Sequence, residues 1–225
     1  VCMAEPSDME VSKEMDVAAL EQFLSHCSRS TVPKKHLIVR EGEPADSLYF
    51  LIEGSATVMM EDKEDPGHEI ILAYLNQGDF IGELGLFFRT SIRSTMVRAR
   101  TECVLAAIKY DVLNALFKNE LKDVHALIMT AVGKQMAQRL LSTSRKVGQL
   151  AFLDVTGRVA RTLLEMCDTP EAMSHPEGTQ IHISRQEIAR NVGCSREMAG
   201  RVLRSLGEQG MIRAHGMDIV VLHPR

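Results

Sequence analysis

Short runs of apolar residues, separated by turn residues, occupy the chain from about residue 31 to residue 107. Each run has the length of a β-strand, and the runs cover residues 47–52, 55–60, 70–75, 80–81, 95–99 and 103–108. Turn-forming residues fill the intervals, as in Glu53-Gly54 and Gln77-Gly78-Asp79. Regularly spaced short strands with such turns predict a closed β structure, either a barrel or a jelly roll.

Helical spacing of apolar residues flanks this strand region on both sides. On the amino-terminal side, a polar and acidic tail leads into residues 16–26, which place Leu20, Phe23 and Leu24 on one helix face. On the other side, residues 120–150 contain no proline and only two glycines, which predicts one long helix.

A seam of residues in alternating steps of four and three runs along this long segment. Its members are Met129, Gly133, Met136, Leu140, Thr143, Val147 and Leu150. The mean period of about 3.5 residues is typical of two helices wound around each other, and we interpret the segment as the helix of a parallel dimer. A single helix packed on its own β domain is about equally compatible with the period. The Thr143 hydroxyl favours the dimer, because a polar residue in an apolar seam costs stability and often specifies register or makes a specific contact.

Helical patterns return after residue 151. A helix is predicted over residues 154–167, a loop over residues 168–180, and a small β-hairpin over residues 211–222. Between the loop and the hairpin, Ser184-Arg-Gln-Glu187 is a capping box that begins one short helix. Ser195 is a second N-cap and begins another. Two short helices joined by a tight turn that contains glycine predict a helix-turn-helix.

The second helix of this motif carries a polar face suited to DNA. Its off-core residues are Arg196, Glu197, Arg201 and Arg204, which project together. Arginine can bond bidentately to guanine, and glutamate can accept from the cytosine amino group. The whole chain has 26 Lys and Arg against 30 Asp and Glu, but residues 179–225 hold seven Arg against four acidic residues. Positive charge is therefore concentrated around the predicted reading helix, as DNA binding requires.

Composition argues against several other classes of protein. No run approaches the roughly twenty apolar residues that span a bilayer, and no signal peptide is recognisable, so we expect a cytoplasmic protein without a membrane partner. The five cysteines are scattered and odd in number, which excludes a disulfide framework and a cysteine zinc site. The eight histidines lack the spacing of metal ligands, so we predict no metal and no enzymatic activity.

The segment Phe80-Ile-Gly-Glu-Leu-Gly-Leu-Phe87, followed by Arg93-Ser94, has the residues to hold an anion. Its two glycines let the backbone turn sharply and present amides at the start of a short helix. Arg93 can brace a phosphate and Ser94 can donate a hydrogen bond, whereas Glu83 is better suited to accept from a ribose hydroxyl. On spacing alone, a turn beside a surface arginine is the better interpretation.

The same segment resembles the phosphate-binding cassette of bacterial cyclic-nucleotide-dependent regulators. Further matches are Leu75-Asn-Gln-Gly-Asp-Phe80, Leu150-Ala-Phe-Leu-Asp-Val-Thr-Gly157 and Val192-Gly-Cys-Ser-Arg-Glu197. The similarity extends from about Leu20 to Val221, and by it the chain is identified as a member of the cyclic AMP receptor protein (CRP/FNR) family.

This resemblance implies an α+β fold with an N-terminal double-stranded β-helix (jelly-roll) cyclic-nucleotide-binding domain, a long dimerisation helix and a C-terminal winged helix-turn-helix. The implied boundaries are 1–18 for the tail, 19–119 for the β domain, 120–150 for the dimerisation helix and 151–225 for the DNA-binding domain. The family further implies a homodimeric transcription regulator with cAMP as its allosteric ligand.

Site residues carry over from the family by motif. The residues implied to bind cAMP are Gly82, Glu83, Leu84, Arg93, Ser94, Thr143 and, from the partner subunit, Ser144. Those expected to contact double-stranded DNA at a palindromic site are Ser184, Gln186, Ser195, Arg196, Glu197, Arg201, Arg204 and His215. Those expected to contact RNA polymerase are Ala172, Met173, Ser174, His175 and Pro176, on the predicted loop.

Alternatives remain within and outside this family. The same scaffold could respond to cGMP or cyclic di-GMP, or bind DNA without a ligand. A redox or gas sensor would need clustered cysteines or a conspicuous haem ligand. A nucleotide-binding module that regulates an enzyme or a channel would not need the helix-turn-helix.

Overall fold

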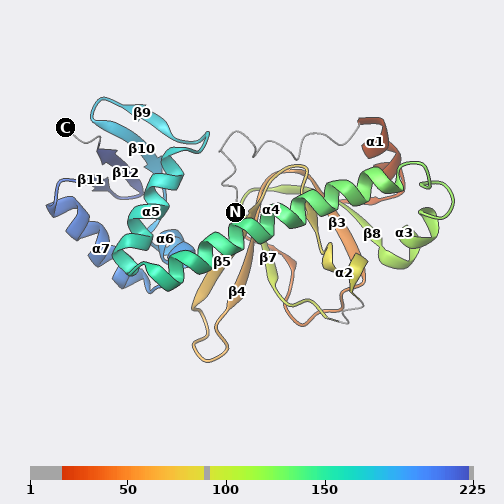
Figure 1. The fold of residues 1–225 in the computed structure, drawn as a ribbon, viewed down its shortest axis with the longest axis horizontal. Coiled ribbons are helices and arrows are strands. Elements are labelled where there is room, and N and C mark those ends of the chain that lie inside the picture. Colours follow the sequence, from red (N-terminus) through yellow and green to blue (C-terminus); the bar gives the residue numbers. More distant parts are fainter. Residues whose placement is uncertain (1–16, 89–91, 223–225) are drawn as a thin grey trace. The chain divides into compact units, whose positions relative to one another are not determined.

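The computed structural model describes residues 17–88 and 92–222, and Figure 1 shows their helices and strands. The chain divides into two compact units. The amino-terminal unit comprises Val1–Met59 and Ala73–Ser142, and the carboxy-terminal unit comprises Met60–Leu72 and Thr143–Arg225. The predicted tail falls on residues 1–18, of which residues 1–16 lie outside the described ranges.

Two four-stranded sheets form where the sequence predicts short strands. The first sheet has the order β1 (Ser28–Val32), β8 (Cys103–Lys109), β3 (Ser47–Glu53) and β6 (Phe80–Ile81). The second has the order β2 (Leu37–Val39), β7 (Met96–Ala99), β4 (Ala56–Glu61) and β5 (Glu69–Leu75). Every predicted run forms a strand, and the α+β fold with a jelly-roll β domain is confirmed.

Strands β1 and β2 have no counterpart among the predicted runs. The sequence of β1, SRSTV, is polar and mostly exposed, and the strand is held by its antiparallel backbone pairing with β8. Strand β2 has only three residues, and its pairing with β7 contains a register shift. A strand that buries few side chains lacks the alternation from which strands are predicted, so only its partner strand reveals it.

Three phenylalanine rings mark the core of the amino-terminal unit. Phe23 of α1 (Val17–Ser25), Phe50 of β3 and Phe80 of β6 meet edge to face, with ring centroids 5.0 to 6.4 Å apart. Such contacts add roughly 0.5–1.5 kcal/mol to the burial of each pair. The side chain of Phe80 is therefore anchored in the core, directly before the segment that resembles the phosphate-binding cassette.

Two helices follow β8, and the first is absent from the sequence prediction. This helix, α3 (Tyr110–Leu116), buries Tyr110 and Leu113. The long helix α4 (His125–Phe152) begins at His125 rather than at residue 120. The predicted start is wrong because the residues between α3 and α4 form turns instead of helix. One turn is closed by the amide of Leu121, which donates to the Leu116 carbonyl at 2.8 Å, and the Leu121 side chain is fully buried.

Beyond α4, residues 155–222 of the carboxy-terminal unit form three helices and a small sheet. The helices are α5 (Val155–Cys167), α6 (Arg185–Val192) and α7 (Arg196–Glu208). The sheet has the order β11 (Ile212–His215), β12 (Asp218–Leu222), β10 (Gly178–His182) and β9 (Met173–His175). The predicted hairpin at residues 211–222 is confirmed as β11 and β12, and the sheet completes a winged helix-turn-helix.

The predicted loop at residues 168–180 is wrong, because it contains β9 and the first half of β10. These strands pair with each other, and β10 also pairs with β12, from Gly178 opposite Leu222 to His182 opposite Asp218. A Cβ at Gly178 would collide with the Val221 carbonyl, so this glycine permits the close pairing. Proline and glycine in this stretch suggest a loop, but here they border a hairpin held by backbone hydrogen bonds.

Both predicted N-caps of the helix-turn-helix are confirmed. The Ser184 hydroxyl accepts from the Glu187 amide at 3.1 Å, and the Ser195 hydroxyl accepts from the Met198 amide at 3.2 Å. Between the helices, Gly193 ends α6 with a φ of +65°, a left-handed conformation that favours glycine. These signals are local in sequence, which is why they could be recognised without the fold.

Candidate functional site

The predicted anion-binding segment turns sharply at Gly82, between the edge strand β6 and the short helix α2 (Leu84–Phe87). Gly82 has a φ of +86°, and a Cβ there would collide with the guanidinium of Arg93. A Cβ at Gly85 would overlap the ring of Tyr110. Both glycines therefore allow the backbone to approach an arginine and a tyrosine that come from other elements.

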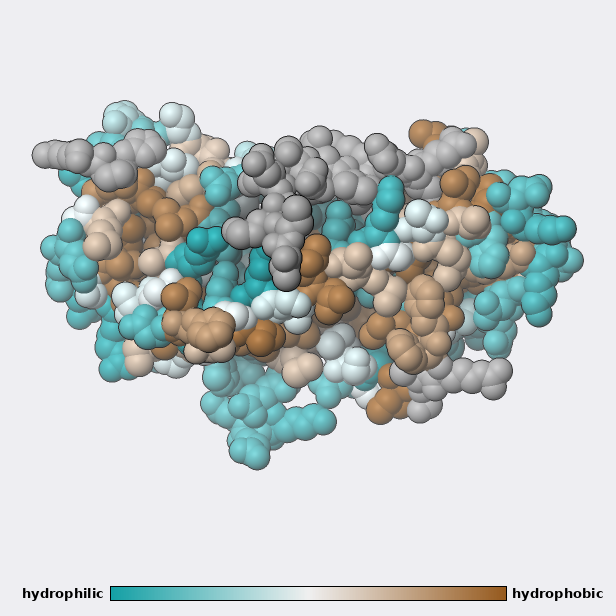
Figure 2. All heavy atoms as spheres, viewed as in Figure 1, coloured by the Kyte–Doolittle hydropathy of each residue, from teal (hydrophilic) through white to brown (hydrophobic). Residues whose placement is uncertain are grey.

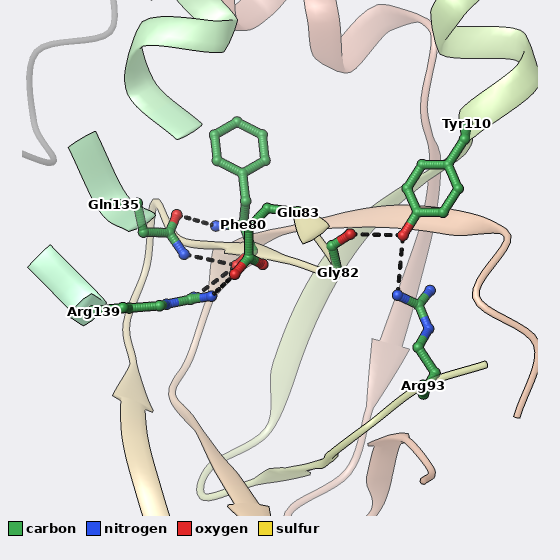
Figure 3. A network of polar contacts seen from close by, with 7 residues as sticks. All are labelled: Phe80, Gly82, Glu83, Arg93, Tyr110, Gln135 and Arg139. Carbon is green, nitrogen blue, oxygen red and sulfur yellow. Dashed lines mark hydrogen bonds and ion pairs between the residues drawn. The ribbon is translucent and has the colours of Figure 1, made fainter. Parts of the chain in front are cut away.

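Arg93 is held beside this turn (Figure 3). Its Nη2 donates to the Ser47 carbonyl at 2.5 Å, and its Nη1 donates to the Tyr110 hydroxyl at 3.1 Å. That hydroxyl donates to the Gly82 carbonyl at 2.6 Å. Burial raises the pKa of Tyr110, so its hydroxyl remains a donor at neutral pH. The guanidinium is thus fixed next to the glycine turn, where its planar fork can receive a phosphate.

Glu83 lies on the opposite side of the segment and faces α4 (Figure 3). Its Oε1 accepts from the Arg139 Nη1 at 2.5 Å, and the Arg139 Nη2 donates to the Phe80 carbonyl at 2.8 Å. The side chains of Glu83 and Arg139 are 10% and 22% exposed, so each charge depends on the other for compensation. The pair holds a carboxylate in place beside the turn.

Gln135, one helical turn before Arg139, also contacts the segment. Its Oε1 accepts from the Phe80 amide and its Nε2 donates to the Phe80 carbonyl, both at 2.8 Å. Helix α4 therefore holds the segment through a neutral amide and a charged guanidinium. Figure 3 shows both side chains reaching the segment from the same helix.

The structure brings together only part of the cAMP set implied by the resemblance. Gly82, Glu83 and Arg93 lie together, whereas Leu84 and Ser94 are exposed next to them in the chain. Thr143 and Ser144 are exposed on α4, about one turn beyond Arg139 along the helix.

Sequence reasoning missed Tyr110, Gln135 and Arg139. A signal for the last two exists, because residues 135, 139 and 143 are spaced by four and share one helix face. Tyr110 carries no comparable signal. Its contact with the Gly82 carbonyl spans 28 residues of sequence and depends on how β8 and β6 are placed.

The predicted DNA-reading residues are distributed over α6, α7 and β11. Those with exposed side chains are Ser195, Arg196, Glu197, Arg201, Arg204 and His215, while Ser184 and Gln186 are half-buried. The opposite face of α7 packs into the core of the carboxy-terminal unit through Ala199, Val202, Leu203 and Leu206. Helix α7 thus presents a polar face of arginine and glutamate to solvent, as the apolar spacing predicts.

Ion pairs occupy two arginines of this unit that lie outside α7. Arg190 pairs with Glu69 at 2.7 Å and Arg213 pairs with Glu177, so neither arginine keeps its full charge for a ligand. Arg196, Arg201 and Arg204 form no ion pair with any residue that the structure describes. Three arginines on the predicted reading helix are therefore available to a ligand.

The predicted polymerase-contacting residues lie on and next to β9. Met173 and Ser174 are exposed on this strand, His175 is half-buried at its end, and Ala172 and Pro176 flank it. These residues belong to an ordered hairpin of the carboxy-terminal unit rather than to the connector that the sequence suggests.

Within residues 17–88 and 92–222, no group of three or more His, Cys, Asp or Glu side chains is placed to hold a metal ion. Over the same ranges, no helix combines the length and the apolar character needed to cross a membrane.

A jelly-roll domain with a glycine turn beside a fixed arginine, followed by a long helix and a winged helix-turn-helix, defines the class of DNA-binding regulators that carry a ligand domain. The family model of the cyclic nucleotide-binding domain matches residues 29–120, and that of the Crp-like helix-turn-helix domain matches residues 157–225. The chain belongs to the Crp/FNR family of transcription regulators.

Individual relatives agree with this assignment over nearly the whole chain. The cAMP-activated global transcriptional regulator Vfr of Pseudomonas aeruginosa is 52% identical over 209 residues, which cover 92% of this chain and 94% of Vfr. The CRP-like protein Clp of Xanthomonas campestris pv. campestris is 45% identical over 214 residues, which cover 95% of this chain and 92% of Clp.

Solved structures also share the fold. The c-di-GMP responsive global regulator CLP of Xanthomonas campestris superposes with a TM-score of 0.88 at 45% identity, over 93% of this chain and 100% of that chain. A CRP/FNR-family transcriptional regulator from Thermus thermophilus superposes with a TM-score of 0.69 at 24% identity, over 87% of this chain and 94% of that chain. The predicted family, fold and role in transcription regulation are confirmed.

Proposed function

We propose that this regulator is a homodimer that binds cAMP at the Gly82 turn, and that the bound nucleotide controls binding of α7 to a palindromic DNA site. One observation carries the proposal. The turn lies between a fixed guanidinium, Arg93, and a fixed carboxylate, Glu83. A cyclic phosphate joined to a ribose needs this combination of a cation and a hydroxyl acceptor at adjacent positions.

The two sides of the turn have separate roles in the proposal. Arg93 would exchange its bonds to the neutral Ser47 carbonyl and Tyr110 hydroxyl for bonds to the anionic phosphate, in which both partners are charged. Glu83 would accept from a ribose hydroxyl while Arg139 keeps its charge balanced. Ser94 and the backbone at Leu84 would add donors to the phosphate.

The adenine base would reach α4 at Thr143 and at Ser144 of the partner subunit. The exposed side of α4 supports a dimer, because Leu140 and Val147 of the predicted seam are 69% and 59% exposed in the single chain. Figure 2 shows apolar side chains along the face of α4 that is turned toward the viewer. Covering these residues with a second copy would remove apolar surface from water.

In the DNA complex, Arg196 and Arg201 would read guanines, and Glu197 would accept from a cytosine. Ser184, Gln186, Ser195, Arg204 and His215 would contact phosphates or support the helices that do. The β9 hairpin, Ala172 to Pro176, would contact RNA polymerase. In domain terms, residues 19–119 would bind the nucleotide, residues 120–150 would dimerise, and residues 151–225 would bind DNA.

Cyclic di-GMP is the alternative ligand, because the similar protein CLP is described as c-di-GMP responsive. The site geometry favours cAMP, since one guanidinium faces one glycine turn and suits a single cyclic phosphate. The relative Vfr is described as cAMP-activated, which supports the same choice. Binding of cGMP would depend on how Thr143 and Ser144 discriminate between bases.

The test is calorimetric titration of the full chain with cAMP, cGMP and cyclic di-GMP, followed by binding to a palindromic DNA probe with and without each nucleotide. We expect cAMP to bind and to tighten DNA binding. The variant Arg93→Gln should lose roughly 10–100-fold in cAMP affinity, because it loses a charge-assisted contact of about 1.5–3 kcal/mol.

The matched control is Arg40→Gln, which removes an exposed arginine that pairs with Glu43 on the surface. It should leave cAMP affinity within about twofold of the wild type, because such surface pairs contribute little. Equal cAMP affinity of both variants would contradict the assigned site. A wild-type chain that ignores all three nucleotides yet binds the probe fully would refute ligand control.

A further inference from the structure

Gln135 is a polar side chain at a core position of α4. The buried residues of this helix are Ile128, Val132 and Gln135, which lie on one face at steps of four and three. Gln135 is only 7% exposed. Burying an amide without hydrogen bonds costs roughly 1–3 kcal/mol, so an apolar residue would suit this position better unless the amide has specific partners.

Its partners are the two backbone groups of Phe80, the N–H and the C=O, each at 2.8 Å. Phe80 lies on β6, the last strand of its sheet. One edge of β6 pairs with β3, where Phe80 is opposite Phe50, and the other edge has no partner strand among the residues that the structure describes. An edge strand leaves a row of backbone groups unpaired, and both groups of one residue point to the same side of an antiparallel ladder. The Gln135 amide presents one acceptor and one donor, as a peptide would, and takes the place of a further strand.

This contact determines where the glycine turn starts, since only Ile81 separates Phe80 from Gly82 and Glu83. Arg139 holds the same segment through the Phe80 carbonyl and the Glu83 carboxylate. The two contacts differ in one respect. The Arg139 contact includes Glu83, which a ribose hydroxyl would contact directly, whereas Gln135 bonds only to backbone and can stay in place.

We infer that Gln135 is a positioning residue for the nucleotide: it fixes the segment from Phe80 to Glu83 on α4, so that the ligand site and the long helix move together. The inference rests on the proposed function, because it assigns Gln135 a role in cyclic nucleotide binding. Gln135 touches no ligand in this scheme. It acts through the position of the Glu83 carboxylate and the Gly82 turn relative to α4.

The test compares Gln135→Met with Gln138→Met in the full chain. Methionine is close to glutamine in length and volume, but it cannot donate to the Phe80 carbonyl, and its thioether is only a weak acceptor for the Phe80 amide. Gln138 is half-buried on the same helix, so its variant controls for the chemical change and for helix propensity. Three quantities are measured: amide hydrogen exchange of peptides over residues 78–86, cAMP affinity, and the ratio of DNA affinities with and without saturating cAMP.

For Gln135→Met we expect faster exchange at residues 80–83, a cAMP affinity lower by roughly 10–100-fold, and a smaller DNA affinity ratio at saturating cAMP. Gln138→Met should match the wild type in all three. A purely structural Gln135 would lower the unfolding temperature but leave cAMP affinity and the DNA ratio unchanged. That result would overturn the inference.

Gln135→Asn serves if the methionine variant does not fold. It keeps an amide in the core but is one methylene shorter, so it cannot reach both Phe80 groups, and we expect the same changes. A wild-type chain that binds no cyclic nucleotide would refute the proposed function instead. Hydrogen exchange alone would then test whether Gln135 fixes the segment from Phe80 to Glu83 on α4. Faster exchange at residues 80–83 in the Gln135 variants would support this role, and unchanged exchange would overturn it.

Discussion

Asp79 lies directly before the anion-binding segment, and its carboxylate is poorly solvated. Burial raises its pKa above the ordinary value of 3.8, and this effect outweighs the hydrogen bond from the Asn76 amide and the positive charge of Arg139. The Asn76 amide donates to Asp79 Oδ2 at 2.7 Å, so the side chain helps to shape the turn that leads into β6. The carboxylate therefore orders the turn but destabilises the folded chain when it is ionised.

Asp79→Asn should raise the free energy of unfolding at pH 7, because asparagine keeps an oxygen for the Asn76 amide without a buried charge. The sign follows from proton binding. Above pH 3.8 the unfolded chain releases a proton that the native carboxyl retains, so wild-type stability falls as pH rises through the raised native pKa. The stability gained by the variant should therefore be smaller at pH 4 than at pH 7.

Chemical denaturation across this pH range measures the effect, with Asp123→Asn as the control on an exposed carboxylate. The control should show no comparable growth with pH. A gain for Asp79→Asn that is constant across the range, or a loss at pH 7, would contradict the assigned burial effect.

At the scale of single elements, helix caps determine where the two helices of the DNA-reading motif begin. The Ser195 hydroxyl satisfies the Met198 amide, one of the first amides of α7, which have no partner inside the helix. Because α7 carries Arg196 and Glu197 in its first turn, fraying of this turn would displace the residues proposed to read bases. Ser205 lies further along the same helix and makes no such cap.

Ser195→Ala should lower the free energy of unfolding by about 1 kcal/mol and accelerate amide exchange in the first turn of α7. Ser205→Ala is the control. Alanine is the better helix former at an interior position, so this substitution should change stability by no more than about 0.5 kcal/mol. Urea denaturation and hydrogen exchange measure both variants. Equal effects of the two substitutions would show that capping at Ser195 does not stabilise the helix.

At the scale of the whole molecule, the single chain leaves the second half of the α4 seam uncovered. Leu140, Val147 and Leu150 are exposed, although Ile128 and Val132 near the start of the same helix are buried. One helix therefore has two kinds of apolar face: one that packs in its own subunit and one that is available to a second copy. Because Crp/FNR regulators are dimers, we expect a second copy of this chain to cover the second face.

Leu140→Glu should convert the dimer to monomers at micromolar concentration. Each protomer would lose roughly 1.5–3 kcal/mol of apolar burial, and a symmetric interface counts this loss twice. The dissociation constant should then rise by at least about 100-fold, as measured by sedimentation, and DNA affinity should fall with it. Leu164→Glu is the control, since Leu164 is 54% exposed on α5 and lies outside the seam. A Leu140→Glu chain that sediments like the wild type would rule out this dimer.

Features that depend on residues close together in the sequence were predicted correctly, and those that depend on distant residues were not. The strand-length runs, both N-caps and the long helix depend on residues a few positions apart, and all appear in the structure with small shifts of their ends. The resemblance placed Gly82, Glu83 and Arg93 in one site, and the structure brings them together. It could not supply Tyr110, because the tyrosine ring reaches this site only through the pairing of the strands.

The sequence by itself determined six strands of the β domain, the helix-turn-helix, the polar face of α7 and the seam of α4, because periodicity and capping are local properties of a chain. The tertiary structure alone decided that Gln135 meets Phe80 across 55 residues and that Arg139 meets Glu83 across 56. It also decided that β1 and β9 are strands, although their side chains are mostly exposed. The physical reason is common to these cases: a buried amide, a buried charge and an exposed strand are each stabilised by a partner distant in sequence, and spacing along the chain carries no information about that partner.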